Sequence, residues 1–158
     1  MNGHNVGRAG ELFVAAEVNR RGGYAATFSG NMPGIDIFAS DASQNHRITV
    51  QVKAKGPNSR TWQTSTRHAR PDADVPEAEK QDRYWVLVDL SHEHPEYYVM
   101  PERWIRNDIH IKHAEYLVRH GGTRPDNASS THHQIEVARV AQWKGRWSEL
   151  GILPEPSA

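Results

Sequence analysis

The chain has 158 residues, of which 19 are Lys or Arg and 19 are Asp or Glu, so its formal net charge is zero. This length suits one domain, and 37% hydrophobic residues suffice for one modest core. The absence of cysteine excludes a disulfide scaffold, a cysteine nucleophile and cysteine-ligated zinc. No apolar run is long enough to cross a membrane, and the first residues lack the pattern of a signal peptide. We therefore expect a single cytoplasmic domain spanning residues 1–158, with no membrane partner and no small-molecule cofactor.

The charges are distributed unevenly along the chain. Residues 43–70 contain six basic residues and no acidic residue, whereas residues 71–108 contain four basic and ten acidic residues. The first stretch is a candidate surface for anions, and Trp62, His46 and His68 within it are candidates for stacking on a nucleic-acid base. The alternative is a solvated basic loop that the acidic stretch balances. Charge alone leaves these two interpretations level.

The first third of the chain predicts one helix followed by three strands. Apolar residues recur at helical spacing through residues 6–21, with Asn5 as the N-cap and two glycines directly after the last turn. The strands that follow are expected at residues 24–28, 35–40 and 47–55, separated by a turn at 29–34 and a polar connection at 41–46. The last of them alternates apolar and polar residues with period two, which is typical of a strand.

The remainder of the chain gives weaker signals. Residues 56–76 show no clear period and are expected to be mobile, and residues 121–133 are expected to form a loop. The apolar run at residues 84–90 is typical of a strand buried on both faces. Further elements are expected as helices at 77–82, 102–108 and 143–150, a strand at 97–100, and a short strand or helix from residue 134. This order predicts an α/β fold with a central mixed β-sheet flanked by helices.

Two of the predicted strands bring an acid, an amide and an amine to one face. If the connection between them is symmetric, Ser40 pairs with Arg47, and Asp36 then lies directly opposite Gln51, about 5 Å away at Cβ. Lys53 follows Gln51 by two residues, so it projects from the same face. The apolar neighbours of these residues point the other way, into the core.

This combination suits a hard divalent cation, because magnesium prefers oxygen ligands. Asp36 and the side-chain oxygen of Gln51 supply two ligands, and a backbone carbonyl near Val52 supplies a third. Lys53 is placed to orient a water molecule or to neutralise charge that develops on a phosphate. The alternatives are a turn-capping role for Asp36 and a plain surface ion pair for Lys53.

Glu11 is the fourth candidate at this site. It lies on the predicted first helix, after Gly7 and Gly10. Glycines at these positions would let the helix and the sheet approach closely, which would bring Glu11 to the edge of the metal site. The alternative is an ordinary exposed Glu on a helix surface.

At these residues the sequence resembles the PD-(D/E)XK nuclease superfamily, which has the restriction-endonuclease-like fold. Within that group it looks most like the Holliday-junction-resolvase-like members. The matching segments, within residues 5–56, are Gly7-Arg8-Ala9-Gly10-Glu11, Gly34-Ile35-Asp36 and Gln51-Val52-Lys53. The resemblance implies an Mg²⁺-dependent deoxyribonuclease, with Mn²⁺ as a substitute, in which these segments supply the metal ligands and the catalytic lysine. It also implies that DNA, including branched or structured DNA, is the partner.

One position departs from the family pattern. The residue two before the motif lysine is usually acidic, and here it is Gln51. A neutral amide removes one negative charge, so the site is expected to hold magnesium more weakly. The second hypothesis is therefore a catalytically weak or inactive nucleic-acid-binding module on the same fold. The third is a non-enzymatic protein-interaction domain whose acidic stretch contacts a basic partner.

Basic side chains near these segments are candidate contacts to the nucleic-acid backbone. They are Arg8, Lys55, Arg60, Arg67 and Arg70. Because cutting two strands needs two sites, a homodimer is also expected, with the strands at 84–90 and 97–100 as candidate edges. Among the ten histidines, His92 and His94 are spaced like two ligands on a strand, but no recognised zinc pattern joins them to others.

Overall fold

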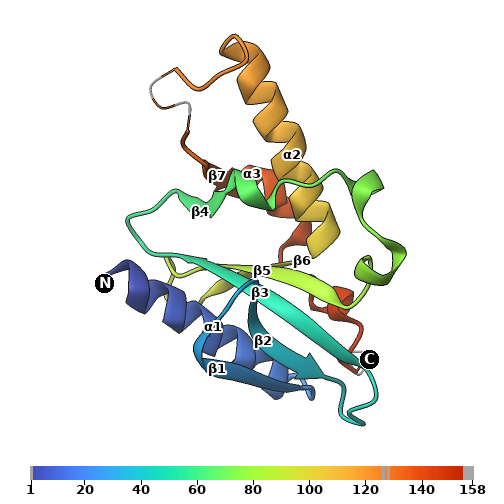
Figure 1. The fold of residues 1–158 in the computed structure, drawn as a ribbon. Helices are drawn as coiled ribbons and strands as arrows, with labels where there is room; N and C mark the ends of the chain where they lie inside the picture. Colours follow the sequence, from blue (N-terminus) through green and yellow to red (C-terminus); the bar gives the residue numbers. More distant parts are fainter. Residues whose placement is uncertain (1, 126, 128, 155–158) are drawn as a thin grey trace.

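The computed structural model describes residues 2–125, 127 and 129–154 and builds them around a five-stranded sheet (Figure 1). Its helices and strands are α1 Gly3–Arg20, β1 Tyr24–Met32, β2 Ile35–Ser40, β3 Arg47–Lys55, β4 Thr61–Ser65, β5 Arg83–Asp89, β6 Glu96–Pro101, α2 Glu102–Arg119, β7 His132–Glu136 and α3 Val137–Val140. Short 3₁₀ turns follow β4, precede β5 and occur near the end of the described chain. None of the described helices is long and apolar enough to cross a bilayer.

The strand order of the main sheet is β1-β2-β3-β5-β6, and β4 pairs with β7 in a separate two-stranded sheet. Strands β3 and β5 run parallel, whereas the other neighbours in the main sheet run antiparallel. The expected α/β fold with a central mixed sheet flanked by helices is therefore confirmed. Because β5 lies between β3 and β6, the apolar run at 84–90 offers no free edge, and that part of the dimer expectation is wrong.

Helix α1 covers one face of the sheet (Figure 1). Its fully buried Val14 and Val18 belong to the same core cluster as Ile37 of β2 and Val50 of β3. The predicted alternation places these apolar residues on the α1 side, as expected for a half-buried pattern. The C-terminal Trp147, Leu150 and Ile152 complete this first core.

The second face of the sheet carries a separate core. Trp85 and Leu87 of β5 pack with Ile105 and Ile109 of α2, and the cluster extends to Trp62 of β4 and Ile135 of β7. Since β5 is buried on both faces, its continuous apolar run is explained. Trp62 is fully buried and donates its indole N–H to the Val88 carbonyl at 2.8 Å, so it is not available to stack on a base.

Several predicted boundaries are wrong. Helix α1 begins at Gly3, three residues before the expected start at Val6, because the Asn2 side chain, not that of Asn5, caps it by accepting the Asn5 N–H at 2.9 Å. Helix α2 runs on to Arg119 rather than ending at residue 108. Residues 56–76 contain strand β4, and residues 143–150 form only short 3₁₀ turns.

Candidate active site

The predicted register between β2 and β3 is confirmed. Ser40 pairs with Arg47 and Ile37 with Val50, so the next position along brings Asp36 opposite Gln51. The two side chains are in contact, because Gln51 donates its Nε2–H to Asp36 Oδ2. The same carboxylate oxygen accepts the backbone N–H of Val52 at 2.7 Å. The Asp36 carboxylate thus accepts a β3 backbone N–H that a carbonyl of a neighbouring strand would otherwise accept, and two hydrogen bonds fix its orientation.

The environment of Asp36 disfavours its negative charge. Burial raises the pKa of Asp36 above its ordinary value, and the nearby charge of Glu11 adds to this effect. The Val52 N–H, the Lys53 ammonium and the Gln51 amide act in the opposite direction. A half-buried carboxylate whose charge is disfavoured gains from a cation beside it, so this position suits a metal ligand.

Glu11 and Asp36 line the same cleft, which has a volume of about 430 Å³ and lies between α1 and the β1–β2 turn region. Glu11 is ion-paired with Arg8 at 2.7 Å. Arg8 also donates to the Phe28 carbonyl at 3.2 Å, so it ties α1 to β1 as well as holding Glu11. The Arg8 guanidinium is therefore engaged within the protein, and we assign it the role of positioning Glu11.

Gly10 is what lets α1 approach the sheet. A Cβ built on Gly10 would lie 2.6 Å from the Ala54 Cβ, whereas one built on Gly7 would meet nothing within 4 Å. The expected close approach of helix and sheet therefore rests on Gly10 and not on Gly7. Because Glu11 is the next residue, this contact sets its distance from the strands that carry Asp36.

Lys53 lies on the same strand and face as Gln51 and is partly buried. Its ammonium nitrogen is 5.9 Å from the centroid of the Trp85 ring. It makes no ion pair with any residue in the described ranges, although its charge acts on both Asp36 and His68. The Lys53 ammonium therefore has no acidic side chain bonded to it among the described residues.

A second cleft opens on the other side of Gln51, with a volume of about 270 Å³. Its lining includes Trp85, His68, Arg83 and Arg106. Burial lowers the pKa of His68, and the charges of Lys53 and Arg106 lower it further, so this imidazole is neutral at pH 7.

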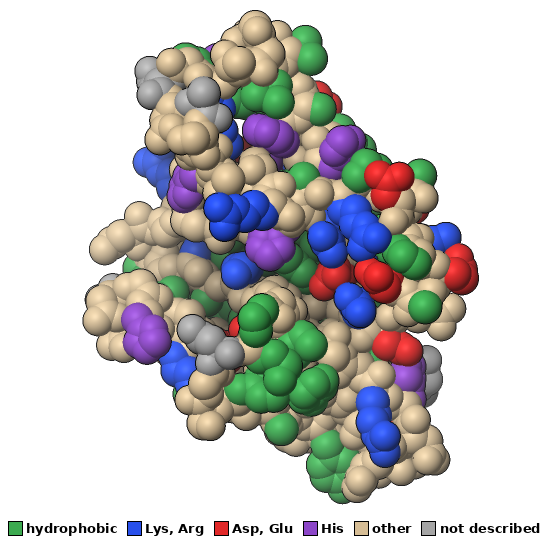
Figure 2. Space-filling view, viewed as in Figure 1, with side chains coloured by type: hydrophobic (Ala, Val, Ile, Leu, Met, Phe, Trp, Pro, Cys, Tyr) green, Lys and Arg blue, Asp and Glu red, His purple; other side chains and the backbone are tan. Residues whose placement is uncertain are grey.

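Arg106 was missed in the sequence because it lies on α2, about 50 residues after Lys53 along the chain. The signal available there was only an arginine on the polar side of a predicted helix. The fold brings it to this cleft by packing α2 on β5. Figure 2 shows Lys, Arg and His side chains spread across the middle of this face, above a group of hydrophobic side chains.

The other predicted nucleic-acid contacts differ from one another in exposure and in ion pairing. Lys55 is 6% exposed and ion-paired with Asp89, so it is a buried structural residue and not a phosphate contact. Arg70 is ion-paired with Glu79 at 2.8 Å. Arg60 and Arg67 are exposed and make no ion pair with described residues. Lys55 and Arg70 thus pair with the acidic stretch, which partly supports the balanced-charge interpretation.

One group of acidic and histidine side chains in the described part of the chain has metal-like spacing. Asp89, His92 and Glu96 offer ligand atoms that all lie within 4.8 Å of one another. Two of the three already have cationic partners, because Asp89 pairs with Lys55 and Glu96 pairs with Lys144. His94, the other half of the spacing noted in the sequence, is not part of this group.

The residues around Asp36 fit a divalent cation in one orientation of the Gln51 amide. With Nε2 toward Asp36, Gln51 acts as a hydrogen-bond donor. Half a turn of the amide places Oε1 there instead, and two oxygen donors from adjacent strands then face a common point. Glu11, in the same cleft as Asp36, is a further oxygen donor once it leaves Arg8.

No protein-family model matches the chain, and no curated protein matches it in sequence. Among solved structures, the chain is similar to a bacterial homing endonuclease, I-Ssp6803I, with a TM-score of 0.48 and 12% sequence identity. That match covers 90% of this chain and 86% of the other. The case for an activity therefore depends on the side chains of this chain.

Proposed function

We propose that the protein is a divalent-cation-dependent endonuclease that hydrolyses phosphodiester bonds in DNA. The observation that carries this proposal is the contact between Asp36 and Gln51, with Glu11 lining the same cleft as Asp36 and Lys53 two residues further along β3. The cation is Mg²⁺, with Mn²⁺ as a substitute, and its ligands are Asp36, Gln51, Glu11 and the backbone at Val52. The combination also supports the resemblance to PD-(D/E)XK nucleases of the Holliday-junction-resolvase-like type.

The reaction adds water to a phosphodiester and releases a phosphomonoester and an alcohol. A bound cation supplies positive charge that stabilises the phosphate under attack and makes water a better nucleophile. Asp36 stays in place because the Val52 N–H holds it. Lys53 has no bonded acid among the described residues, so its ammonium is free to meet the negative charge that develops on the phosphate oxygens.

The binding of the DNA strand uses the basic side chains around the second cleft. Arg83 and Arg106 line it beside Gln51, each in an ion pair, with Glu79 at 3.8 Å and with Glu102 at 3.3 Å respectively. The exposed Arg60 and Arg67, which have no ion pair to described residues, lie on the segment that leads to it. Contacts from such side chains go to phosphates and position the strand without specifying its sequence. The proposed substrate class therefore includes branched and structured DNA.

Cleavage assays on the full chain test the proposal. The substrates are supercoiled plasmid, single-stranded DNA and branched DNA, each with Mg²⁺, with Mn²⁺ and with EDTA. We expect cleavage only with a divalent cation, and a loss of at least about 100-fold in rate for Asp36→Asn and for Lys53→Met. Arg47→Gln is the matched control, because Arg47 is an exposed cation at the far end of β3 with no ion pair to described residues.

Two results would contradict the proposal. One is cleavage that continues at an unchanged rate in both Asp36→Asn and Lys53→Met, which would point to a contaminating nuclease. The other is the absence of both cleavage and DNA binding at low salt, which would favour the protein-interaction hypothesis.

A second candidate function follows from Gln51 itself. Gln51 is 7% exposed and donates its amide hydrogen to Asp36, so the site as built is closed by a hydrogen bond. On this hypothesis the protein binds DNA in a salt-sensitive manner and does not cut it with any metal. Gln51→Glu should then tighten Mn²⁺ binding and create cleavage, whereas in an active wild-type enzyme it changes only the metal concentration needed.

A homodimer is proposed as the form that cuts both strands of a duplex. The edges of the main sheet are β1 and β6. Part of the β6 edge is already occupied, because Tyr98 forms an isolated bridge with Lys144. Sedimentation of the full chain with and without duplex DNA tests this form, and a monomer under both conditions would exclude it.

A further inference from the structure

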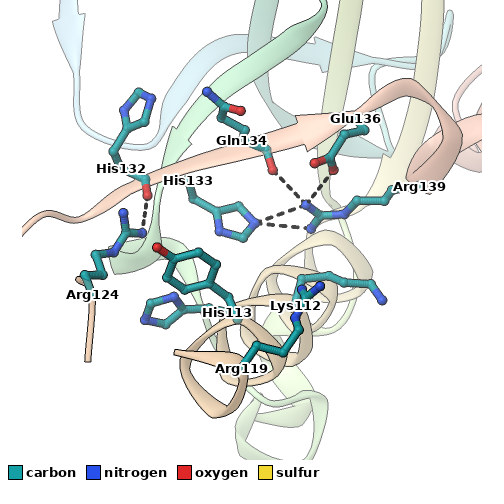
Figure 3. Close-up of a pocket in the computed structure, with 10 residues that line it drawn as sticks. Lys112, His113, Arg119, Arg124, His132, His133, Gln134, Glu136 and Arg139 are labelled. Carbon is teal, nitrogen blue, oxygen red and sulfur yellow. Dashed lines mark hydrogen bonds and ion pairs between the residues drawn. The ribbon is translucent and has the colours of Figure 1, made fainter. Parts of the chain in front are cut away.

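A third polar pocket, of about 410 Å³, lies between the C-terminal half of α2 and strand β7 (Figure 3). It shares no lining residue with either cleft of the candidate active site. Its walls come from three elements and the segment between α2 and β7: His113 and Arg119 from α2, Arg124 from that segment, His133 from β7 and Arg139 from α3. The fold therefore builds a site here that the proposed cleavage reaction does not use.

The pocket is strongly positive. Four of its lining side chains are Lys or Arg and one is Glu, which gives a formal charge of +3 for the lining residues. Lys112 pairs with Glu115 at 3.0 Å. Arg119 and Arg124 make no ion pair with any acid in the described part of the chain. Two guanidinium groups in this pocket therefore lack a bonded carboxylate among the described residues. Arg124 donates to the His132 carbonyl and lies over the Tyr116 ring, and Arg119 donates to the Glu115 carbonyl at 3.4 Å, so each keeps further N–H groups for a ligand.

Arg139 forms the fixed wall of the pocket. Its guanidinium donates to Asp108 at 2.6 Å. It also donates to the Gln134 carbonyl at 2.7 Å and contacts Glu136 and His133 (Figure 3). These contacts use all of its donor groups. Arg139 thus builds the site and is not left with donors for a ligand.

The imidazole of His133 is a neutral part of the wall. His133 is 9% exposed, and Arg139 donates to its Nε2 from two guanidinium nitrogens at 3.2 Å. Burial lowers the pKa of His133 to about 4, and the charges of Arg139 and His113 act in the same direction. With Nε2 accepting, the ring carries its proton on Nδ1 and is a donor there.

Buried polar atoms without hydrogen-bond partners gather at this pocket. Among the described residues, four side-chain nitrogen or oxygen atoms are buried and unpartnered. Two of them, His113 Nδ1 and Arg124 Nε, belong to the pocket lining. A third, Thr64 Oγ1, is on the residue directly opposite His133 in the β4–β7 pair. Because buried polar groups are nearly always bonded, this concentration points to a ligand.

The positive charge of the lining residues excludes a metal ion as that ligand. The guanidinium groups of Arg119 and Arg124, which have no carboxylate partner among the described residues, would repel a cation, and no lining histidine belongs to the group with metal-like spacing found among the described residues. An anion with several acceptor oxygens suits donors that converge from different elements, and arginine recognises phosphate with parallel N–H groups.

We propose that this pocket is a phosphate-binding site in which Arg124, Arg119 and His113 hold one phosphate group. The phosphate group belongs either to a nucleic-acid strand or to a small phosphate ester, and both sources present the same oxygens to these donors. The site is separate from the Asp36 cleft and needs no metal. If the chain does not bind phosphate at this pocket, the proposed cleavage activity is unaffected. If the chain does not cleave DNA, the proposed phosphate site is likewise unaffected.

Calorimetric titration of the full chain with inorganic phosphate, in EDTA and at constant ionic strength, tests the site. We expect saturable binding that weakens at least about tenfold in Arg124→Gln, since a charged hydrogen-bond donor is lost. Arg119→Gln is a second variant, at an exposed position without an ion pair to described residues, and the same loss is expected. Arg47→Gln is the control and should bind phosphate as the wild type does.

Competition identifies the source of the phosphate. The titration is repeated in the presence of a short single-stranded oligonucleotide with a terminal phosphate, of the same oligonucleotide with a terminal hydroxyl, and of acetate. Competition by the first alone indicates a strand end, competition by both indicates internal phosphodiesters, and competition by neither indicates a small phosphate ester. Equal competition by acetate, or wild-type phosphate affinity in both Arg124→Gln and Arg119→Gln, would overturn the proposal.

Discussion

The contact between Gly10 and Ala54 allows the geometry of the candidate site to be tested through stability. Replacing a glycine with alanine inside a helix stabilises it by about 0.5–1 kcal/mol through backbone entropy. At Gly7 this gain stands alone, because the new methyl group meets nothing within 4 Å. At Gly10 the methyl carbon would lie 2.6 Å from the Ala54 Cβ, which is attached to the strand backbone and cannot rotate away.

Overpacking of this kind costs about 1–3 kcal/mol. The helix-propensity gain is common to both variants, so it cancels in their difference. We therefore expect Gly10→Ala to be less stable than Gly7→Ala by about 1–3 kcal/mol. Urea unfolding followed by far-ultraviolet circular dichroism measures both free energies of unfolding under the same conditions.

A third variant separates the clash from other causes. Ala54→Gly removes the opposing methyl group, so in the Gly10→Ala background it should restore part of the lost stability, although alone it weakens the strand. The coupling between the two changes should reach about 1 kcal/mol. Equal stabilities for Gly10→Ala and Gly7→Ala, or no coupling with Ala54→Gly, would refute the claim that Gly10 sets the spacing between α1 and β3.

Three further outcomes are expected. Lys55→Met should lower the free energy of unfolding by about 3–5 kcal/mol, because it leaves the buried Asp89 carboxylate unpaired. Arg47→Gln should change it by no more than about 0.5 kcal/mol. If urea unfolding gave equal losses for the two variants, Lys55 would have to be treated as a surface residue. The pKa of His133 is about 4 in the folded chain against an ordinary 6.5, so the unfolded chain binds more protons between these two pH values. The stability of the chain therefore falls as pH drops from 6.5 toward 4. In thermal melts, the melting temperature of His133→Gln should fall less over this pH range than that of the wild type, and an equal fall would contradict this. The hydrogen bond that His46 donates to the Asp82 carboxylate raises the pKa of His46. The stability that this pair contributes is therefore present below pH 6.5 and is lost as pH rises through the raised value. Asp82→Asn should abolish this pH dependence, and its persistence in the variant would assign it to another group.

The local pattern of the sequence was enough to place the candidate site. The alternation along residues 47–55 and the symmetric connection before it predict the register in which Asp36 meets Gln51, and the structure has that register. This succeeds because antiparallel pairing across a short connection depends on residues that are close in the chain. The predicted fold class is right for the same reason, since most of the elements have periodic patterns of their own.

The burial of Lys55 depends on contacts with residues that are distant in the chain. The alternation of β3 assigns Lys55 to a polar face, and a polar face implies exposure only if nothing covers it. Strand β4 packs against β3 and places the Trp62 ring centroid 5.2 Å from the Lys55 ammonium nitrogen, and Lys55 is buried in an ion pair with Asp89. No periodicity within residues 47–55 contains this information, because a strand's own pattern does not report what packs against it.

The same limit explains strand β4 and the phosphate pocket. Residues 61–65 have no strong pattern and become a strand by pairing with residues 132–136, about 70 positions further along. Arg106 reaches the second cleft, and His113 meets His133, only once α2 has packed on the sheet. Sequence determined the two paired strands that hold the acid and the amide, because their contacts are local. Tertiary structure decided which charges stay exposed, because burial is a property of the elements that pack together.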